Sequence, residues 1–382
     1  MPFSEPTFTV GIEEEYLLVD PKTRALVSDP PEAMHKAFEA RFKNLVKPEF
    51  LKSQIEVATR PCETLSEAGE NLAELRRSVS ELAGEYGLAP IAASTHPFSK
   101  WQEQKHTDKR RYNIMAEDMQ TVVHRLLVCG MHVHVGVEDD EMRIDLLNQV
   151  AYFLPHLLAL STSSPFWRGH DTGLMSYRLS IFDELPRTGL PERFDSFADY
   201  KRHVRVLQRA GLIEDASMLW WDARLSARFP TLEMRITDVC TRLDDALGVA
   251  ALFLCIVRML YRLRRANQRW RMYANMLINE NRWRAQRYGL DGSLMDYGAG
   301  ELVPFADLIE ELLDMVAEDS EALNCVSQLA HVRDIVKNGA SAHRQLEVYK
   351  QTKADGKTHE EALDAVVDML VEETMLGVGR GE

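Results

Sequence analysis

The sequence predicts an α+β fold, in which an antiparallel sheet is followed by packed helices. The expected strands alternate apolar and polar residues or carry polar residues within apolar runs, which is typical of antiparallel rather than buried parallel strands. The last third of the chain has an almost wholly helical pattern. No linker rich in glycine, serine or proline divides the chain, and no internal repeat is present, so we expect residues 1–382 to form a single domain.

The strands are expected where β-branched and aromatic residues gather, because these side chains fit a pleated, half-buried surface. Such segments are residues 8–19, 54–58, 88–93, 124–137, 175–182 and 231–239. Amphipathic helices are expected between them. In residues 66–86 the apolar positions recur every three or four residues and therefore share one face; they are Leu72, Leu75, Val79 and Leu82.

The C-terminal third predicts a series of helices. They are expected over residues 244–268, 306–315, 321–337, 342–350 and 360–376, with a turn at 355–357 before the last of them.

The composition and the net charge argue against some classes of function. The 382 residues are 45% hydrophobic and 27% charged, as in ordinary globular proteins. A net charge of −14 argues against broad binding to nucleic acid or to anionic membranes. The longest uncharged apolar run, residues 246–257, ends at Arg258 and is too short to span a bilayer.

The N-terminus and the cysteines predict a cytoplasmic protein. The first residues lack a basic region followed by an apolar one, so no signal peptide is expected. The five cysteines are scattered and never spaced as CxxC, which indicates reduced thiols rather than a disulfide framework or a zinc site. Whether the chain forms a homodimer is left open.

The segment from Gly11 to Tyr16 holds the most informative motif. Alternate side chains of a strand point to the same face, so Glu13 and Glu15 project together, opposite Glu14. Two like charges about 7 Å apart on an apolar strand repel each other unless a cation lies between them. Oxygen ligands favour Mg²⁺ or Mn²⁺. The alternative is a surface strand with solvated glutamates.

Two other expected strands also carry an acid. Glu56 shares a face with Gln54, and Glu233 shares a face with Arg235, with which it could form a purely structural ion pair. Three strands that each present a carboxylate predict a cluster that is unstable without divalent cations. Its members would be Glu13, Glu15, Glu56 and Glu233.

Histidines and arginines accompany these acids. His132 and His134 share a face of another strand; they could bind a transition metal, donate to phosphate or carboxylate, or be core histidines bonded to the backbone. Arginine offers a two-pronged donor for phosphate and carboxylate. No Walker A or GxGxxG motif is present, so a nucleotide would be held through metal and arginine. The arginines are Arg178 on an expected strand, Arg187 in a loop, and Arg224 and Arg228 before the strand at 231–239.

Nine arginines lie between residues 258 and 287, where Glu280 is the one acid. Four of them recur at helical spacing: Arg258, Arg262, Arg265 and Arg269. This stripe is either a solvated face, a face paired with acidic helices such as residues 306–321, or a basic rim that attracts an anionic substrate.

Six segments, taken in order, resemble the glutamate–cysteine ligase type 2 family of carboxylate–amine ligases. The segments are 11–15, 55–62, 130–136, 176–178 with 187–189, 231–235 and 281–285. The resemblance implies a glutamine-synthetase-like fold, in which a curved antiparallel sheet carries the site on its concave face. It also implies flanking helices and a helical C-terminal third.

The resemblance further implies ATP, Mg²⁺ or Mn²⁺, and an amide bond formed through an acyl phosphate, with glutamate–cysteine ligase activity as one instance. It assigns metal binding to Glu13, Glu15, Glu56 and Glu233. It assigns catalytic contacts with phosphate or carboxylate to Arg178 and Arg235, and substrate or ATP binding to Arg60, His132, His134, Arg187 and Arg224. The partners would be a small carboxylic acid and an amine, and the motifs leave open which.

Two other functions are weighed against a ligase. The paired histidines suggest a metal-dependent hydrolase of the amidohydrolase kind, but that class needs such a pair near the N-terminus and a (β/α)₈ alternation, whereas here it falls at 132 and the last third is helical. A relative that binds nucleotide without catalysis is the other alternative.

Overall fold

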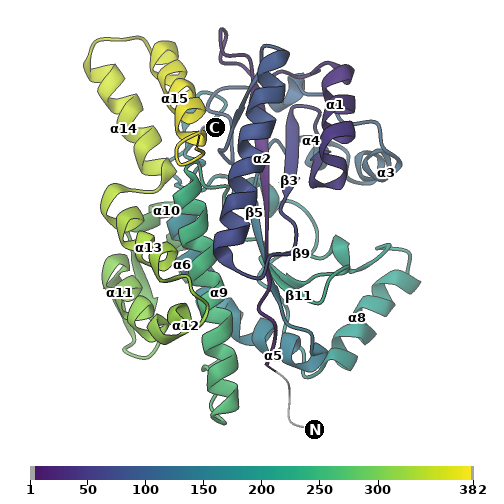
Figure 1. The fold of residues 1–382 in the computed structure, drawn as a ribbon, viewed down its shortest axis with the longest axis vertical. Helices are drawn as coiled ribbons and strands as arrows, with labels where there is room; N and C mark the ends of the chain where they lie inside the picture. The colour runs from purple at the N-terminus through teal and green to yellow at the C-terminus, as the bar shows by residue number, and fades with distance from the viewer. Residues whose placement is uncertain (1–4, 380–382) are drawn as a thin grey trace.

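A seven-stranded antiparallel sheet forms the framework of the computed structural model, which describes residues 5–379 (Figure 1). The strand order is β10-β11-β5-β1-β3-β2, with β4 also paired to β1, and each of these pairs is antiparallel, as the sequence predicts. The strands are β1 (Val10–Val19), β2 (Val46–Pro48), β3 (Gln54–Ala58), β4 (Ala89–Ile91), β5 (Met131–Gly136), β10 (Ala223–Leu225) and β11 (Thr231–Met234).

The strand β1 has two unlike faces. Ile12, Glu14 and Tyr16 are fully buried on one of them, and Glu13 and Glu15 project from the other, as the alternation of a strand requires. The buried face packs against α2 (Leu65–Glu85), while the neighbouring β5 packs against α9 (Leu243–Arg265). Both helices lie beside the sheet in Figure 1. The opposite face is left for the cavity described below.

Helix α9 is the core helix of the chain. It is the one helix among the described residues that is long and apolar enough to cross a membrane, but 78% of that apolar window is buried inside the structure.

Part of the predicted arginine stripe lies at the basic end of this helix. Arg258 and Arg262 bond Asp319 at 2.7 and 2.9 Å, so pairing with an acidic helix is confirmed for these two. Arg269 lies beyond the helix and pairs with Asp145.

The remaining elements surround this framework. They are α1 (Glu32–Phe42), α3 (Arg110–Met119), α4 (Thr121–His124), α5 (Asp140–Val150), α6 (Leu154–Ser161), α7 (Arg178–Phe182), α8 (Phe197–Arg209) and α10 (Asn275–Tyr288), with the short paired strands β6 (Phe166–Trp167) and β7 (His170–Asp171), β8 (Thr188–Gly189) and β9 (Trp220–Trp221), and β12 (Ser293–Asp296) and β13 (Glu301–Pro304).

The helical C-terminal third is confirmed. It holds α11 (Phe305–Met315), α12 (Ala317–Ala322), α13 (Val326–Asn338), α14 (Ser341–Ala354) and α15 (His359–Thr374). The single helix expected over 321–337 is in fact divided, because Asn324 takes a left-handed conformation (φ 52°) that ends a right-handed helix. Helix α15 begins with a capping box between Thr358 and Glu361.

The strand predicted over 175–182 is wrong. Residues Arg178–Phe182 form α7, whose backbone closes local bonds such as that from the N–H of Asp183 to the carbonyl of Leu179. The strand predicted over 231–239 ends at Met234 because the N–H groups of Arg235 and Ile236 both donate to the carbonyl of Asp222, which breaks the ladder. Similarly, the strand predicted over 124–137 begins only at Met131.

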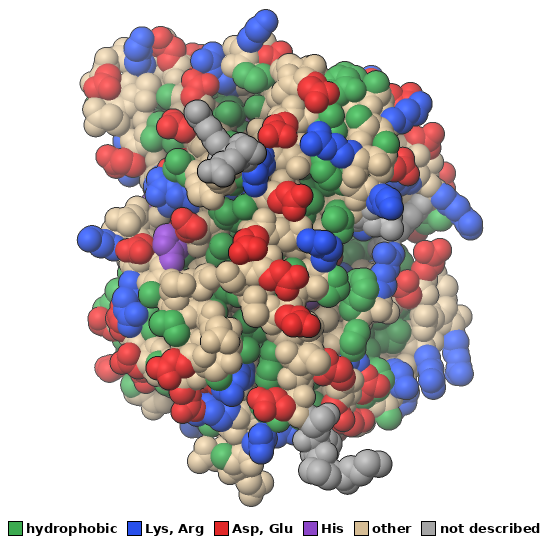
Figure 2. Space-filling model, viewed as in Figure 1, with side chains coloured by type: hydrophobic (Ala, Val, Ile, Leu, Met, Phe, Trp, Pro, Cys, Tyr) green, Lys and Arg blue, Asp and Glu red, His purple; other side chains and the backbone are tan. Residues whose placement is uncertain are grey.

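Figure 2 shows acidic and basic side chains interspersed over the face in view, with neither sign gathered into a continuous area. All five cysteines are free and buried.

Candidate functional site

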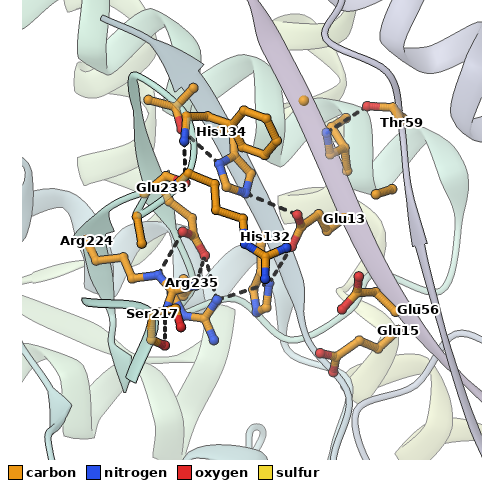
Figure 3. A pocket seen from close by; sticks show the side chains of 18 of the residues that line it. Glu13, Glu15, Glu56, Thr59, His132, His134, Ser217, Arg224, Glu233 and Arg235 are labelled. Carbon is orange, nitrogen blue, oxygen red and sulfur yellow. Dashed lines mark hydrogen bonds and ion pairs between the residues drawn. The ribbon is translucent and has the colours of Figure 1, made fainter. Parts of the chain in front are cut away.

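A cavity of about 770 Å³ lies against the face of the sheet from which Glu13 and Glu15 project. Of the eleven residues that the sequence proposes for a site, ten line this cavity: Glu13, Glu15, Glu56, Arg60, His132, His134, Arg178, Arg224, Glu233 and Arg235. Figure 3 shows most of them converging from separate strands. Arg187 is the exception.

The strand register brings these side chains together. Glu15 lies opposite Glu56 on β3, and Glu13 lies opposite His132 on β5. On the other side, Glu233 lies opposite both His134 and Arg224. Directly opposed side chains are close neighbours on one face of a sheet. Residues more than 200 positions apart therefore share one surface.

Three carboxylates form an acid cluster made of Glu15, Glu49 and Glu56. Their ligand oxygens all lie within 4.8 Å of one another. Lys47 is a basic neighbour of the cluster, with its Nζ 3.9 Å from Glu56. Sequence analysis missed Glu49 because it follows β2 in a loop, where an acid is unremarkable. The structure holds it in place through a bond from the N–H of Phe50 at 2.7 Å.

The acid cluster resists ionisation. Burial raises the pKa of Glu15 to about 7, against the influence of Arg178 and with a further rise from Glu56. Burial and Glu49 raise the pKa of Glu56 well above its ordinary value, and burial and Glu15 raise the pKa of Glu49. Clustered carboxylates with raised pKa values are what a divalent cation would stabilise. The donor set, oxygen alone, fits Mg²⁺ or Mn²⁺.

Glu13 is instead held by two histidines. Its carboxylate oxygens lie 3.3 Å from Nδ1 of His132 and 3.4 Å from Nε2 of His134. Burial raises the pKa of Glu13, but the interactions of its carboxylate with His132 and His134 outweigh burial and bring the pKa below its usual range. For His132, burial and the charge of Arg235 lower the pKa to about 4. Figure 3 shows Glu13 between the two rings.

Glu233 is bound by two arginines. Arg224 donates to both its oxygens at 2.8 and 2.9 Å, and Nη1 of Arg235 donates at 2.5 Å. Burial raises the pKa of Glu233, but the two guanidinium groups outweigh burial and lower it. The four acids proposed as metal ligands therefore line one cavity without forming one cluster. Of the four, Glu15 and Glu56 belong to the acid cluster, and metal binding by all four stays a prediction.

Arg178 reaches the cavity from α7 by passing close to Gly130. A Cβ atom at position 130 would lie 2.5 Å from Nη2 of Arg178, so glycine is required for this approach. Arg178 donates to the carbonyls of Arg235 and Ile236 at 3.3 and 3.2 Å. The Nε atoms of Arg178 and Arg235 are buried and have no hydrogen-bond partner among the described residues. Each is a donor that a ligand oxygen could satisfy.

The two remaining arginines differ in position. Arg60 is exposed at the wall of the cavity. Arg187 does not line it: its Nε donates to the carbonyl of Met218 at 3.1 Å, and its guanidinium lies 5.2 Å from the ring of Trp220, which does line the cavity. Any contribution of Arg187 to substrate binding would be through Trp220.

Comparison with known proteins gives the family of this chain. The model of glutamate-cysteine ligase family 2 matches residues 9–368. The chain belongs to this family. A relative from Rhodospirillum rubrum, provisionally named glutamate–cysteine ligase 2, is 63% identical over 98% of this chain and 97% of its own length. A relative with the same name from Jannaschia sp. is 52% identical over 97% of this chain and 98% of its own length.

Two solved structures share the fold of this member of glutamate-cysteine ligase family 2. A bifunctional glutathione synthetase from Pasteurella multocida gives a TM-score of 0.67 at 16% identity, covering 96% of this chain, which spans about half (52%) of that protein. A glutamate–cysteine ligase from Francisella tularensis, solved with AMP, gives a TM-score of 0.64 at 13% identity, covering 99% and 91%. The predicted family, fold class and ligase assignment are thus confirmed at the level of the family.

Proposed function

We propose that this chain joins a carboxylic acid to an amine in an ATP-dependent reaction that passes through an acyl phosphate. Family membership supports a ligase. The observation that carries the proposal is the division of one cavity between an acid cluster and buried arginines whose Nε atoms lack partners. Such a cavity can hold a metal-bound polyphosphate on one side and an anionic substrate or phosphoryl group on the other.

The chemistry explains why both halves are needed. A carboxylate does not acylate an amine at neutral pH, because its leaving group would be oxide. When a carboxylate oxygen attacks the γ-phosphorus of ATP, the bond from that phosphorus to the β–γ bridging oxygen breaks and ADP leaves. The amine nitrogen then attacks the acyl carbon, phosphate leaves with the carboxylate oxygen, and the nitrogen loses a proton.

The residues of the chain fit these steps. Glu15, Glu49 and Glu56 would hold Mg²⁺ or Mn²⁺, which neutralises triphosphate charge when bound. Arg178 and Arg235 would donate to oxygens of the transferred phosphoryl group or of the acid substrate. We see no reason in the geometry to assign a covalent nucleophile.

We propose glutamate and cysteine as the first substrates to test, because relatives carry the name glutamate–cysteine ligase. We also propose that the chain is one ligase domain, since the family match runs from residue 9 to 368 without a break. The cytoplasmic location stays a prediction, and the question of a homodimer stays open.

A screen of ADP release over carboxylic acids crossed with amines tests the function. A productive pair should release ADP and the amide in equal amounts. Acid labelled with ¹⁸O in its carboxylate should pass one labelled oxygen to phosphate, which identifies the acyl phosphate. ATP binding without ADP release for any pair would indicate a non-catalytic relative. Amide hydrolysis without ATP would favour the hydrolase.

A further inference from the structure

Arg282 connects two segments that carry the arginines of the cavity, although it does not line the cavity itself. It lies on α10, and its side chain is only 9% exposed. Its Nη1 and Nη2 donate to the carboxylate of Asp183 at 2.7 and 2.8 Å. Its Nε and Nη2 donate to the carboxylate of Asp222 at 2.7 and 3.2 Å. One guanidinium thus holds two carboxylates, each through two bonds.

Each of these carboxylates belongs to a segment of the site. Asp183 is the C-terminal cap of α7, the helix that begins with Arg178. Asp222 lies between β9 and β10, two residues before Arg224. Moving Asp183 would therefore move the helix of Arg178, and moving Asp222 would move the strand of Arg224.

Asp222 also fixes the third arginine. Its carbonyl accepts the N–H groups of Arg235 and Ile236 at 2.8 and 3.0 Å, and these bonds end β11 where the side chain of Arg235 turns into the cavity. Arg178 closes the arrangement by donating to the carbonyls of the same two residues. The positions of Arg178, Arg224 and Arg235 therefore all depend on two aspartates held by Arg282.

We propose that Arg282 is a positioning residue that sets the arginines of the cavity for an anionic ligand. The identification of this anionic ligand as ATP rests on the proposed function. The planar fork of arginine suits two carboxylates at once, whereas the point charge of lysine does not. A displacement of about 1 Å at a reacting group can lower the rate about a hundredfold. Loss of the Arg282 guanidinium should therefore displace the arginines of the cavity and lower the rate.

A matched control lies elsewhere in the chain. Arg344 on α14 is also nearly buried, at 11% exposed, and also bonds two carboxylates, Glu373 at 2.8 Å and Asp245 at 3.0 Å. It does not line the cavity. Arg282→Lys and Arg344→Lys make the same chemical change in similar surroundings, so both should lower the melting temperature. Only Arg282→Lys should alter the site.

The test compares ATP affinity by calorimetry, turnover by ADP release, and Mg²⁺ affinity measured without nucleotide. Arg282→Lys should raise the dissociation constant of ATP and lower kcat by about tenfold or more, and Arg344→Lys should leave both within about twofold. Mg²⁺ affinity should change much less than ATP affinity in both variants, because, among the described residues, the segments that carry the acid cluster make no bond with Arg282 or Arg344. A folded Arg282→Lys protein with normal ATP affinity and turnover overturns the proposal.

Two further outcomes are a variant that does not fold and a wild type that does not turn over. If Arg282→Lys does not fold, Asp183→Asn replaces it, because Asp183 is 35% exposed and its loss leaves the bond between Arg282 and Asp222 intact; normal ATP affinity and turnover in that variant would overturn the proposal. If the wild type binds ATP but releases no ADP with any substrate pair, the proposed function fails, and the ATP affinities still decide the role of Arg282. A wild type that binds no ATP overturns both.

Discussion

Glu15 and Glu56 face each other across β1 and β3 as directly paired residues of the sheet, with both carboxyl groups turned into the same cavity. Like charges in directly opposed positions destabilise a sheet. Burial adds to the destabilisation because it disfavours the charged form of both groups, which raises their pKa values. The fold therefore carries a local cost at this point, which a bound cation would relieve.

Replacing one of these acids should separate stability from metal binding. Glu56→Gln removes a carboxyl group whose ionisation is opposed by burial and by Glu49, so at pH 8 and without divalent ions it should stabilise the protein by about 0.5–1 kcal/mol. The wild type should gain about 2.7 kcal/mol when Mg²⁺ reaches 100 times its dissociation constant, and the variant should lose most of this gain. Thermal melts with and without Mg²⁺ measure both. Glu39→Gln, at an exposed position on α1, is the control and should change neither. A variant that keeps the full Mg²⁺ response would contradict the metal assignment of Glu56.

Metal affinity should depend on pH. Because the pKa of Glu15 is raised to about 7, this carboxyl is partly protonated near neutrality and must lose its proton to bind a cation. Apparent Mg²⁺ affinity should therefore fall as pH falls from 8 to 6, by up to about tenfold per pH unit below 7 for one displaced proton. Calorimetry in two buffers with different ionisation enthalpies measures the released proton directly. An affinity that stays constant over this range would show that Glu15 is not a ligand.

Much of the site could be predicted because acids within apolar strands are anomalous. The strand alternation placed Glu13 and Glu15 on one face and Glu14 on the other, which the structure confirms: Glu14 is fully buried and pairs with Arg76 at 2.7 Å. Glu49 could not be found in this way, because a glutamate in a loop has an unremarkable sequence context. Its closeness to Glu15 and Glu56 arises only when β2 pairs with β3.

The errors arose where tertiary contacts override a local pattern. Residues 175–182 alternate as a strand would, yet Arg178, Leu179 and Ile181 are all buried in a short helix. The sequence could not predict either that Glu233 is bound by arginines and lies outside the acid cluster. Arg224 was known only as a possible anion ligand, and its two bonds to Glu233 depend on the pairing of β10 with β11.

A buried histidine that does not line the cavity, His96, should make stability depend on pH. The ring of His96 lies 2.8 Å from the carbonyl of Arg24 through Nε2, while Nδ1 accepts the N–H groups of Phe98 and Ser99. Burial lowers the pKa of His96 to about 4, against the bond with Arg24. Since the unfolded chain binds a proton below about 6.5 and the folded chain does not until about 4, this contribution is complete above 6.5 and is lost as pH falls toward 4.

The contribution of His96 to the free energy of unfolding can be measured by comparing the wild type with a variant. The contribution of His96 should be about 3 kcal/mol at most, from a shift worth 1.36 kcal/mol per pH unit. His96→Asn should be less stable than the wild type at pH 8 and should lose less stability between pH 6.5 and 4, as measured by urea unfolding. His170→Asn, at an exposed position on β7, is the control and should keep the slope of the wild type. Equal slopes for His96→Asn and the wild type would contradict the prediction.

Gly130 should contribute to activity because two parts of the site meet there. Its N–H donates to Oε2 of Glu15 at 2.8 Å, and the absent side chain leaves room for the guanidinium of Arg178. Gly130→Ala would place a Cβ atom 2.5 Å from Nη2 of Arg178, which is buried and cannot turn aside without losing its bonds to the carbonyls of Arg235 and Ile236. We expect turnover to fall by about ten- to a hundredfold through this displacement, with a loss of about 1–3 kcal/mol in the free energy of unfolding from overpacking.

The same substitution elsewhere separates displacement of Arg178 from a general effect of alanine. A Cβ atom at Gly84, within α2, meets nothing within 4 Å, so Gly84→Ala should stabilise the helix by about 0.5–1 kcal/mol and leave ADP release unchanged. Combining Gly130→Ala with Arg178→Lys should recover part of the lost stability, because the lysine lacks the Nη2 atom that would lie nearest the new Cβ atom. It should not recover turnover, because lysine cannot donate to several oxygens through a planar fork. If Gly130→Ala alone turned over normally, Arg178 could not act from the position that the structure gives it. If the double variant regained full activity, the clash would matter but the guanidinium would not, and the catalytic assignment of Arg178 would be wrong.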